Sequence, residues 1–142
     1  MLAASYYGDA IAWWENDGNE NFTKHTIISN YGSARSVYAI NIDDDNDIDV
    51  LGTAFADSTV SWFENINNSF TEHVIDSSLT GASHVFAIDF NDDSDVDVAA
   101  TGYYDGNVEE EIGVSSFYPL ISYGVTARFF LGRPLRLFLL LR

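Results

Sequence analysis

The sequence predicts an all-β protein built from short antiparallel strands that recur as a repeat. First, residues 36–42 match residues 84–90 without gaps, a spacing of 48 residues. Second, short runs rich in β-branched and aromatic residues alternate with breaks rich in Asp, Asn, Gly and Ser. Third, no segment before the C-terminal tail keeps a helical apolar period over the length of a helix. We therefore expect strands throughout the repeated part.

Each repeat unit contains four predicted strands, which in the middle unit lie near 36–42, 48–55, 59–64 and 70–75. Four short strands in a unit of about 40–50 residues are the signature of a β-propeller blade. We predict about 2–2.5 blades, an incomplete propeller: a partial blade at 1–35, a blade at 36–83 and a partial blade at 84–108. The phrases that match between units are Trp13–Asn16 with Trp62–Asn65, Phe22–Ile27 with Phe70–Ile75, and Ser5–Asp9 with Thr53–Asp57.

Residues 109–142 form an atypical C-terminal tail. The repeat does not return there, and four of the six cations lie in this region although no acid follows Glu111. Charged residues and Pro134 interrupt its apolar run, which is too short for a transmembrane helix of about 20 residues. We interpret the tail as a non-repeat segment, either artefactual or a basic amphipathic surface segment.

Two acidic segments carry the main functional signal. Residues 41–50 read Asn-Ile-Asp-Asp-Asp-Asn-Asp-Ile-Asp-Val, with an oxygen-bearing side chain on every second residue, and residues 89–98 repeat this pattern. Like charges at this spacing repel by about 1 kcal/mol per pair in water. A hard cation such as Ca²⁺, which binds about 6–8 oxygen ligands, would compensate that repulsion. The alternative is a solvated acidic run, which does not explain the apolar residues at matching positions.

The spacing excludes an EF-hand, which needs a glutamate at its twelfth position and a helix on either side. Counted from Asn41 or Asp89, the twelfth residue is Gly52 or Ala100. Both segments instead offer ligands at positions 1, 3, 5 and 9, with Asp49 or Asp97 closing the loop. Loop position 7 is also acidic in both segments. The candidate calcium-binding residues are Asn41, Asp43, Asp45, Asp47 and Asp49 in the first segment and Asp89, Asn91, Asp93, Asp95 and Asp97 in the second.

The repeated phrases and the two acidic segments occur in a fixed order. In this respect residues 2–108 resemble the FG-GAP/VCBS repeat, the blade type of integrin α-subunit propellers and of many secreted propellers. The resemblance rests on Ile11–Gly18, on Phe22–Ile27 and on both acidic segments. It implies Ca²⁺ held by side chains at loop positions 1, 3, 5 and 9 and by the main-chain carbonyl of Asp47 or Asp95 at position 7. The family has glycine at positions 4 and 6, where this chain has Asp44 and Asn46, then Asp92 and Ser94.

The composition limits the partners. A formal net charge of −16 argues against nucleic acid and against an anionic membrane as partners, because both need a cationic surface. Cysteine is absent, which excludes disulfides. The first five residues lack the features of a signal peptide. No nucleophile motif or phosphate-binding glycine loop occurs, so we expect no enzyme.

The predicted function is a non-catalytic, calcium-binding propeller segment of an extracellular or cell-surface protein that serves adhesion or recognition of a protein or glycan, and that associates with further blades. Two alternatives remain: a carbohydrate-binding lectin that uses Trp14 or Trp62, and an accessory part of a secreted hydrolase. His25 and His73 are repeat equivalents that we interpret as structural, and we interpret His84 as incidental. The tryptophans are interpreted as packing between blades.

Overall fold

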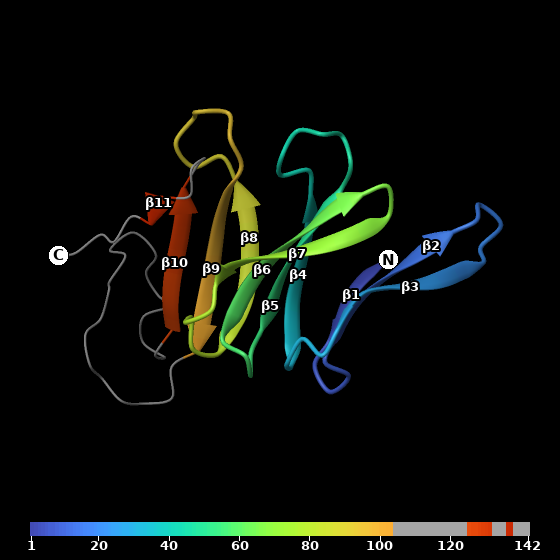
Figure 1. Ribbon diagram of the computed structural model, residues 1–142, viewed down its shortest axis with the longest axis horizontal. Coiled ribbons are helices and arrows are strands. Elements are labelled where there is room, and N and C mark those ends of the chain that lie inside the picture. Colours follow the sequence, from blue (N-terminus) through green and yellow to red (C-terminus); the bar gives the residue numbers. More distant parts are fainter. Residues whose placement is uncertain (104–124, 132–135, 138–142) are drawn as a thin grey trace.

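The computed structural model describes residues 1–103, 125–131 and 136–137, and these residues form three antiparallel β-sheets without a helix (Figure 1). Within these ranges no helix is long and apolar enough to cross a membrane. Sheet 1 contains β1 (Leu2–Ser5), β2 (Ala10–Asn16) and β3 (Phe22–Ser29). Sheet 2 contains β4 (Ala34–Ile40), β5 (Asp49–Ala54), β6 (Thr59–Ile66) and β7 (Ser69–Asp76). Sheet 3 contains β8 (Ala82–Ile88), β9 (Asp97–Tyr103), β10 (Val125–Leu131) and β11 (Arg136–Leu137).

The all-β class and the four strands of the middle unit are confirmed. In sheet 2 the strands pair in the order β4-β5-β6-β7, so each strand pairs with its neighbours in sequence. The repeat also extends to the register: Ile40 pairs with Asp49, and Ile88 pairs with Asp97. A β-bulge follows the first residue of both β4 and β8. The sequence repeat is therefore a repeat of strand pairing.

Sheet 3 differs from expectation because part of the tail joins it. β10 pairs with the free edge of β9 from Val125 opposite Tyr103 to Phe130 opposite Val98, and β11 pairs with β10. No phrase of the repeat recurs in 125–137, so no sequence pattern indicated this pairing. Residues 104–124, 132–135 and 138–142 lie outside the described residues. The prediction of a basic amphipathic segment stays a prediction.

β1 and β2 align with β5 and β6 at a spacing of 49 residues. The turn between Ser5 and Ala10 encloses as many residues as the turn between Ala54 and Thr59. The sequence match of Ser5–Asp9 with Thr53–Asp57, at a spacing of 48, is therefore one residue out of step with the strand pairing. On this alignment Trp14 is the counterpart of Phe63.

Two apolar clusters hold the three sheets in a row. One lies between sheets 1 and 2 and contains Ile11, Tyr31, Ala34, Val50, Ala54 and Phe63. The other lies between sheets 2 and 3 and contains Leu51, Val60, Leu79, Ala82, Val85, Ala87, Val98 and Ala100. Successive residues of a strand point to opposite faces, so β5 supplies Val50 to one cluster and Leu51 to the other. Sheet 2 is consequently covered on both faces.

Candidate cation-binding loops

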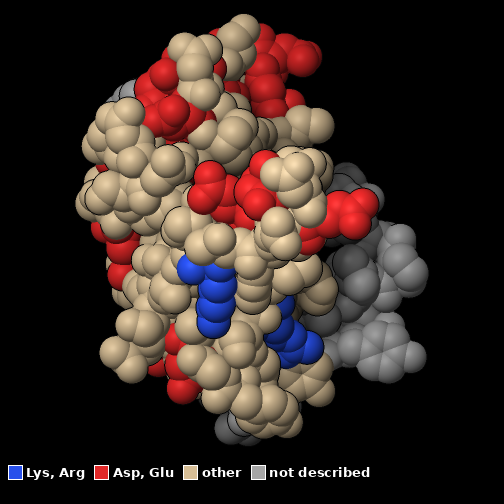
Figure 2. Space-filling view, turned by 90° about the vertical axis from the view of Figure 1, so that its right-hand side faces the viewer, with Lys and Arg blue, Asp and Glu red and all other residues tan. Residues whose placement is uncertain are grey.

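The two acidic segments form the β4–β5 and β8–β9 loops, which lie at the same end of the row of sheets (Figure 1). Figure 2 shows acidic side chains gathered toward that end, whereas Lys and Arg lie in the lower half of the view. Of the cations with described side chains, Lys24 lies over the Trp14 ring and Arg35 over the Phe55 ring. Neither of these contacts neutralises the loops.

Both loops adopt a left-handed backbone at positions 4 and 6. The φ angles are 62° at Asp44 and 74° at Asn46, and 59° at Asp92 and 74° at Ser94. These are the positions where the family that the sequence resembles has glycine. A left-handed backbone costs a residue with a side chain about 1–2 kcal/mol, although Asn and Asp tolerate it better than most. The turn that the family builds with glycine is therefore kept here under local strain.

Side-chain oxygens at alternate positions of the second loop accept hydrogen bonds from the backbone N–H two residues later. Asp89 Oδ1 accepts from Asn91 at 3.1 Å, Asn91 Oδ1 from Asp93 at 3.0 Å, and Asp93 Oδ1 from Asp95 at 3.0 Å. The two carboxylate oxygens of Asp89 also accept from the N–H groups of Asp93 and Ser94. Each of these three side chains is therefore held by the backbone of its own loop, in a run of consecutive Asx-type turns.

The first loop repeats this pattern at positions 3 and 5 but not at position 1. Asp43 Oδ1 accepts from Asp45 at 3.4 Å, and Asp45 Oδ1 accepts from Asp47 at 2.8 Å. Asn41 Oδ1, by contrast, is buried and has no hydrogen-bond partner among the described residues. A buried oxygen without a partner costs about 1–3 kcal/mol. Asn41 therefore needs a partner that the described part of the chain does not supply.

Asp49 and Asp97, at position 9, fasten the loops to the sheets. Both are fully or almost fully buried. Asp49 Oδ2 accepts from Ile42 N–H at 3.0 Å and its Oδ1 from Asn65 N–H at 2.8 Å, while Asp97 Oδ2 accepts from Phe90 N–H at 2.8 Å. Each carboxylate thus closes its loop by a hydrogen bond, and Asp49 also binds the β6–β7 hairpin. The predicted role of both residues as cation ligands stays a prediction.

Hydrogen bonding also affects the charge at position 1 of the second loop. Partial desolvation raises the pKa of Asp89, but hydrogen bonds from the backbone N–H groups of Ser94, Asn91, Asp92 and Asp93 together outweigh it. The net result is a pKa below the ordinary value, because an N–H donor stabilises the carboxylate form. Asp89 is therefore held as a carboxylate by the loop itself.

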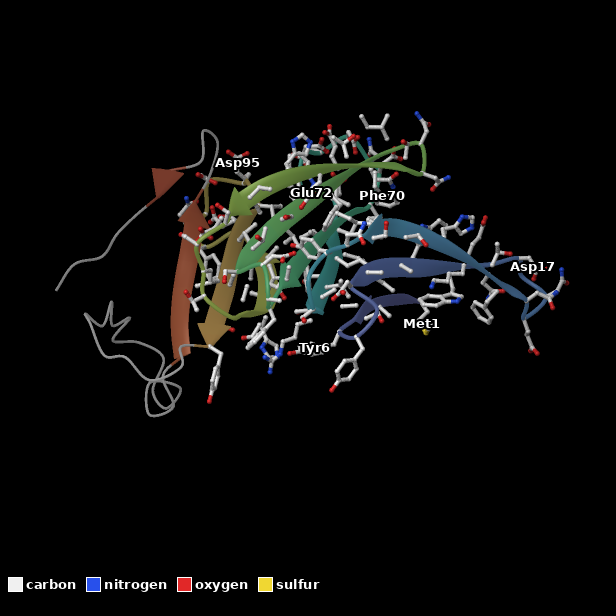
Figure 3. The ribbon with its side chains drawn as sticks, turned by 60° about the horizontal axis from the view of Figure 1, so that its bottom comes forward. Met1, Tyr6, Asp17, Phe70, Glu72 and Asp95 are labelled. Carbon is white, nitrogen blue, oxygen red and sulfur yellow. The ribbon has the colours of Figure 1, made fainter. Side chains whose placement is uncertain are left out.

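The structure brings the ten predicted residues into two loops, but not into a tight carboxylate cluster. In the ranges described, no three carboxylate or imidazole side chains lie together as a metal-binding group. Asp47 Oδ2 accepts from Asn67 N–H at 3.2 Å, and the Asp95 side chain is exposed (Figure 3). The apolar loop positions are divided: Val50 and Val98 are buried, while Ile48 and Phe90 are exposed.

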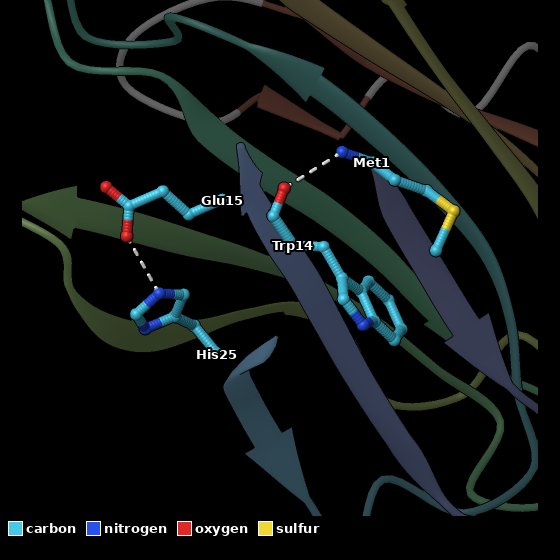
Figure 4. A network of polar contacts seen from close by, with 4 residues as sticks. All are labelled: Met1, Trp14, Glu15 and His25. Atoms are coloured by element: carbon cyan, nitrogen blue, oxygen red, sulfur yellow. Dashed lines mark hydrogen bonds and ion pairs between the residues drawn. The ribbon is translucent and has the colours of Figure 1, made fainter. Parts of the chain in front are cut away.

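The repeated histidines take part in one repeated contact. His25 stacks on Trp13 with 4.6 Å between ring centroids, and its Nε2 lies 3.0 Å from Glu15 Oε2 (Figure 4). The counterpart contacts are His73 on Trp62 at 4.7 Å, and His73 Nε2 with Glu64 Oε2 at 2.7 Å. Trp62 is also packed against the cluster between sheets 2 and 3. These contacts favour a structural role for His25, His73 and Trp62.

Sequence reasoning missed two aspartates at the opposite end of the sheets, the end where Figure 3 shows Tyr6. Asp9 Oδ1 accepts from Ser33 N–H at 2.7 Å, and Asp57 Oδ2 accepts from Gly32 N–H at 2.6 Å. Sheets 1 and 2 therefore both hold the linker that joins them. The available signal was the repeated Asp at the end of the Ser5–Asp9 and Thr53–Asp57 match.

Comparison with known proteins adds no identification. No family model matches the chain, and neither the curated proteins nor the solved structures contain a match to it.

Proposed function

We propose that this chain is a non-catalytic, calcium-binding segment of a β-propeller of the FG-GAP/VCBS type, from a secreted or cell-surface protein that serves adhesion or recognition. Three antiparallel sheets in a row, with strands paired in sequence order and an acidic loop between the first two strands of sheets 2 and 3, support the propeller part of the proposal. The resemblance of the sequence to that repeat supports the extracellular role.

The observation that carries the calcium site is the buried Oδ1 of Asn41. It lies at position 1 of the loop and has no partner among the described residues. Its counterpart Asp89 accepts three N–H groups. The loop that leaves this oxygen free still carries five carboxylates between Asp43 and Asp49. A bound cation would give the Asn41 oxygen a partner and offset the repulsion between the acids.

The donor set fits a hard cation. Ca²⁺ takes oxygen ligands from carboxylates, amide carbonyls and the main chain, and these are the groups that both loops offer. The side chains of Asn41, Asp43, Asp45 and Asp49 and the carbonyl of Asp47 would hold it in the first loop. Asp89, Asn91, Asp93, Asp97 and the carbonyl of Asp95 would hold it in the second. When bound, the cation supplies positive charge and no chemistry of its own.

The hydrogen bonds of the two position-9 aspartates bear on how much a bound cation would add to the stability of the fold. Asp49 and Asp97 tie each loop to its sheet by hydrogen bonds that involve no cation. A cation that binds the folded chain alone at about 100 times its Kd stabilises it by about 2.7 kcal/mol per site. Calcium would thus add to the stabilisation that these hydrogen bonds already give.

Thermal unfolding with Ca²⁺ and with chelator tests the proposal. We expect calcium to raise the melting temperature and Asp45→Ala combined with Asp93→Ala to remove that rise. Asp44→Asn is the matched control: it removes a loop charge at a position that is not a proposed ligand and keeps a residue that tolerates the left-handed backbone. A melting curve that is the same with calcium and with chelator would refute the site. If Asp44→Asn also abolishes the calcium-dependent rise in melting temperature, the rise reflects unspecific screening of the loop charges and not a specific site.

A further inference from the structure

The sequence contains two Asn-x-Ser/Thr triplets, and both lie on the hairpin that joins the last two strands of a sheet. Residues 67–69 (Asn-Asn-Ser) form the turn between β6 and β7, and residues 21–23 (Asn-Phe-Thr) begin β3. Neither middle residue is proline, so both triplets fit the acceptor motif for N-linked glycosylation. Because a glycan is bulky and hydrophilic, an acceptor needs an exposed side chain that the fold does not use.

The side chain of Asn67 meets both conditions. Asn67 and Asn68 are exposed and form a two-residue turn between Ile66 and Ser69, which pair with each other. Their φ angles of 53° and 65° are both positive, as in a type I′ hairpin turn. The backbone N–H of Asn67 donates to Asp47 Oδ2 at 3.2 Å, but among the described residues its side-chain amide has no hydrogen-bond partner. Nδ2 of Asn67 is therefore open to modification.

The side chain of Asn21, by contrast, is engaged in its own turn. Its Nδ2 donates to Asp17 Oδ2 at 2.9 Å, and its backbone N–H donates to Asp17 Oδ1 at 3.2 Å. Sheet 2, which carries Asn67, is covered by a neighbouring sheet on both faces, and its β6–β7 turn is still exposed. Of the two triplets, residues 67–69 therefore have the better placed acceptor.

The β6–β7 turn lies beside the first acidic loop, at the outside of the row of sheets (Figure 1). Asn65 joins the same two segments, because its Nδ2 donates to the carbonyl of Ile48 at 3.0 Å. Ile66, directly before Asn67, is 51% exposed. A glycan on Asn67 would stand next to this apolar side chain and shield it from solvent. It would leave the contact with Asp47 intact, since that contact uses the backbone N–H.

We propose that Asn67 carries an N-linked oligosaccharide, attached as the chain is secreted. In the attachment, Nδ2 of Asn67 bonds to C1 of a sugar that is carried on a lipid diphosphate. The C1–O bond to the diphosphate breaks, the amide loses one proton and the lipid diphosphate leaves, so the step needs no oxidant or reductant. The lipid donor and the transferase belong to a eukaryotic secretory pathway. The inference rests on the secreted location in the proposed function and not on calcium binding.

Production of the whole chain in a eukaryotic secretory host, behind a cleavable leader, tests the proposal. Trypsin cleaves after Lys24 and Arg35 and at no other site before Arg128, so Asn21 and Asn67 fall in different peptides. We expect the peptide that contains Asn67 to carry a glycan that an N-glycosidase removes, which leaves aspartate at position 67. A secreted chain in which this peptide is unmodified refutes the proposal.

Variants of the turn separate the motif from the fold. Asn67→Gly removes the acceptor and keeps a residue that adopts the left-handed backbone of this position. Ser69→Ala removes the hydroxyl of the motif from an exposed position. Both substitutions should abolish the glycan, whereas Ser69→Thr keeps the hydroxyl and should retain it. A glycan that persists in Ser69→Ala, or that is lost in Ser69→Thr, overturns the assignment.

Two further measurements keep this result apart from the calcium site. Circular dichroism of each variant establishes that it is folded. The calcium-dependent rise in melting temperature is measured on chain produced in bacterial cytoplasm, which carries no such glycan. A calcium effect without a glycan on secreted Asn67 refutes the acceptor and leaves the cation site standing. A glycan at Asn67 without a calcium effect supports the acceptor and refutes the cation site.

Discussion

The carboxylate of Asp57 lies directly against the backbone of Gly32 and accepts its N–H at 2.6 Å, which fastens the linker between sheets 1 and 2 to the β5–β6 turn. A Cβ added to Gly32 would collide with this carboxylate. We expect Gly32→Ala to lower the free energy of unfolding by about 1–2 kcal/mol, because the Asp57 side chain must move away and give up a hydrogen bond. Urea unfolding measures the change.

A double-mutant cycle isolates this contact. Asp57→Ala removes the acceptor and should cost about 1 kcal/mol alone. The variant that carries both substitutions should lose less than the sum of the single losses, because each removes the same hydrogen bond. Strict additivity would show that the Gly32 and Asp57 effects are independent.

Asp49 and Asp45 should differ sharply in calcium-free buffer. Asp49 is buried and accepts hydrogen bonds from Ile42 and Asn65, so Asp49→Ala leaves two N–H groups without an acceptor and should cost about 3 kcal/mol. Asp45 is exposed, and its Oδ1 accepts one local N–H. Asp45→Ala should change stability little until calcium is added. Equal losses for the two variants in chelator would contradict the division into an anchoring and a cation-binding residue.

Ser94 offers a stabilising substitution. Its φ of 74° lies in the left-handed region, which glycine adopts without a Cβ penalty. Ser94→Gly should raise the free energy of unfolding by about 0.5–1 kcal/mol, after allowing for the greater flexibility of glycine in the unfolded chain. The N–H that Ser94 donates to Asp89 is retained. Ser94→Ala keeps the strain and should give no gain; a gain as large as that of glycine would point to the lost hydroxyl instead.

Acid should remove the contribution of Asp89 to stability. Its pKa in the folded chain is lowered by backbone N–H donors, whereas the unfolded value is about 3.9. The stabilisation is therefore present above the unfolded pKa and is lost as the pH falls through the folded pKa. In chelator, the urea midpoints of the original chain and of Asp89→Asn should differ above about pH 4 and converge below it. A difference that stays constant down to the lowest pH would refute this titration.

The sequence supports prediction of the strands more strongly than prediction of their edges and partners. Alternating apolar residues and Asp- or Gly-rich breaks predicted β4 to β7, because side chains on opposite faces of a strand meet different surroundings. The addition of β10 to β9 follows from unpaired backbone groups at the edge of β9, which accept many sequences. Pairing between backbone groups places few requirements on the side chains of the added strand. No sequence pattern therefore predicted the pairing of β10 with β9.

For the candidate loops, too, one part could be predicted from the sequence and another part could not. The positions of the two loops and their alternating oxygens could be predicted because they repeat, whereas the hydrogen bonds of Asp49 to Ile42 and Asn65 could not. The sequence did not show that Asn41 Oδ1 would be buried without a partner while Asp89 accepts three N–H groups. That difference depends on the side-chain conformation of Asn41 and of Asp89. The neighbouring residues in each loop determine that conformation.

The amino-acid order alone determined the all-β class, the repeat and the two acidic loops, because these follow from local periodicity and local turn chemistry. Tertiary structure decided which apolar side chains are covered: Tyr38 is packed between sheets 2 and 3, while its counterpart Phe86 is 46% exposed. Identical patterns thus meet different surroundings, since burial depends on whether another sheet stands opposite.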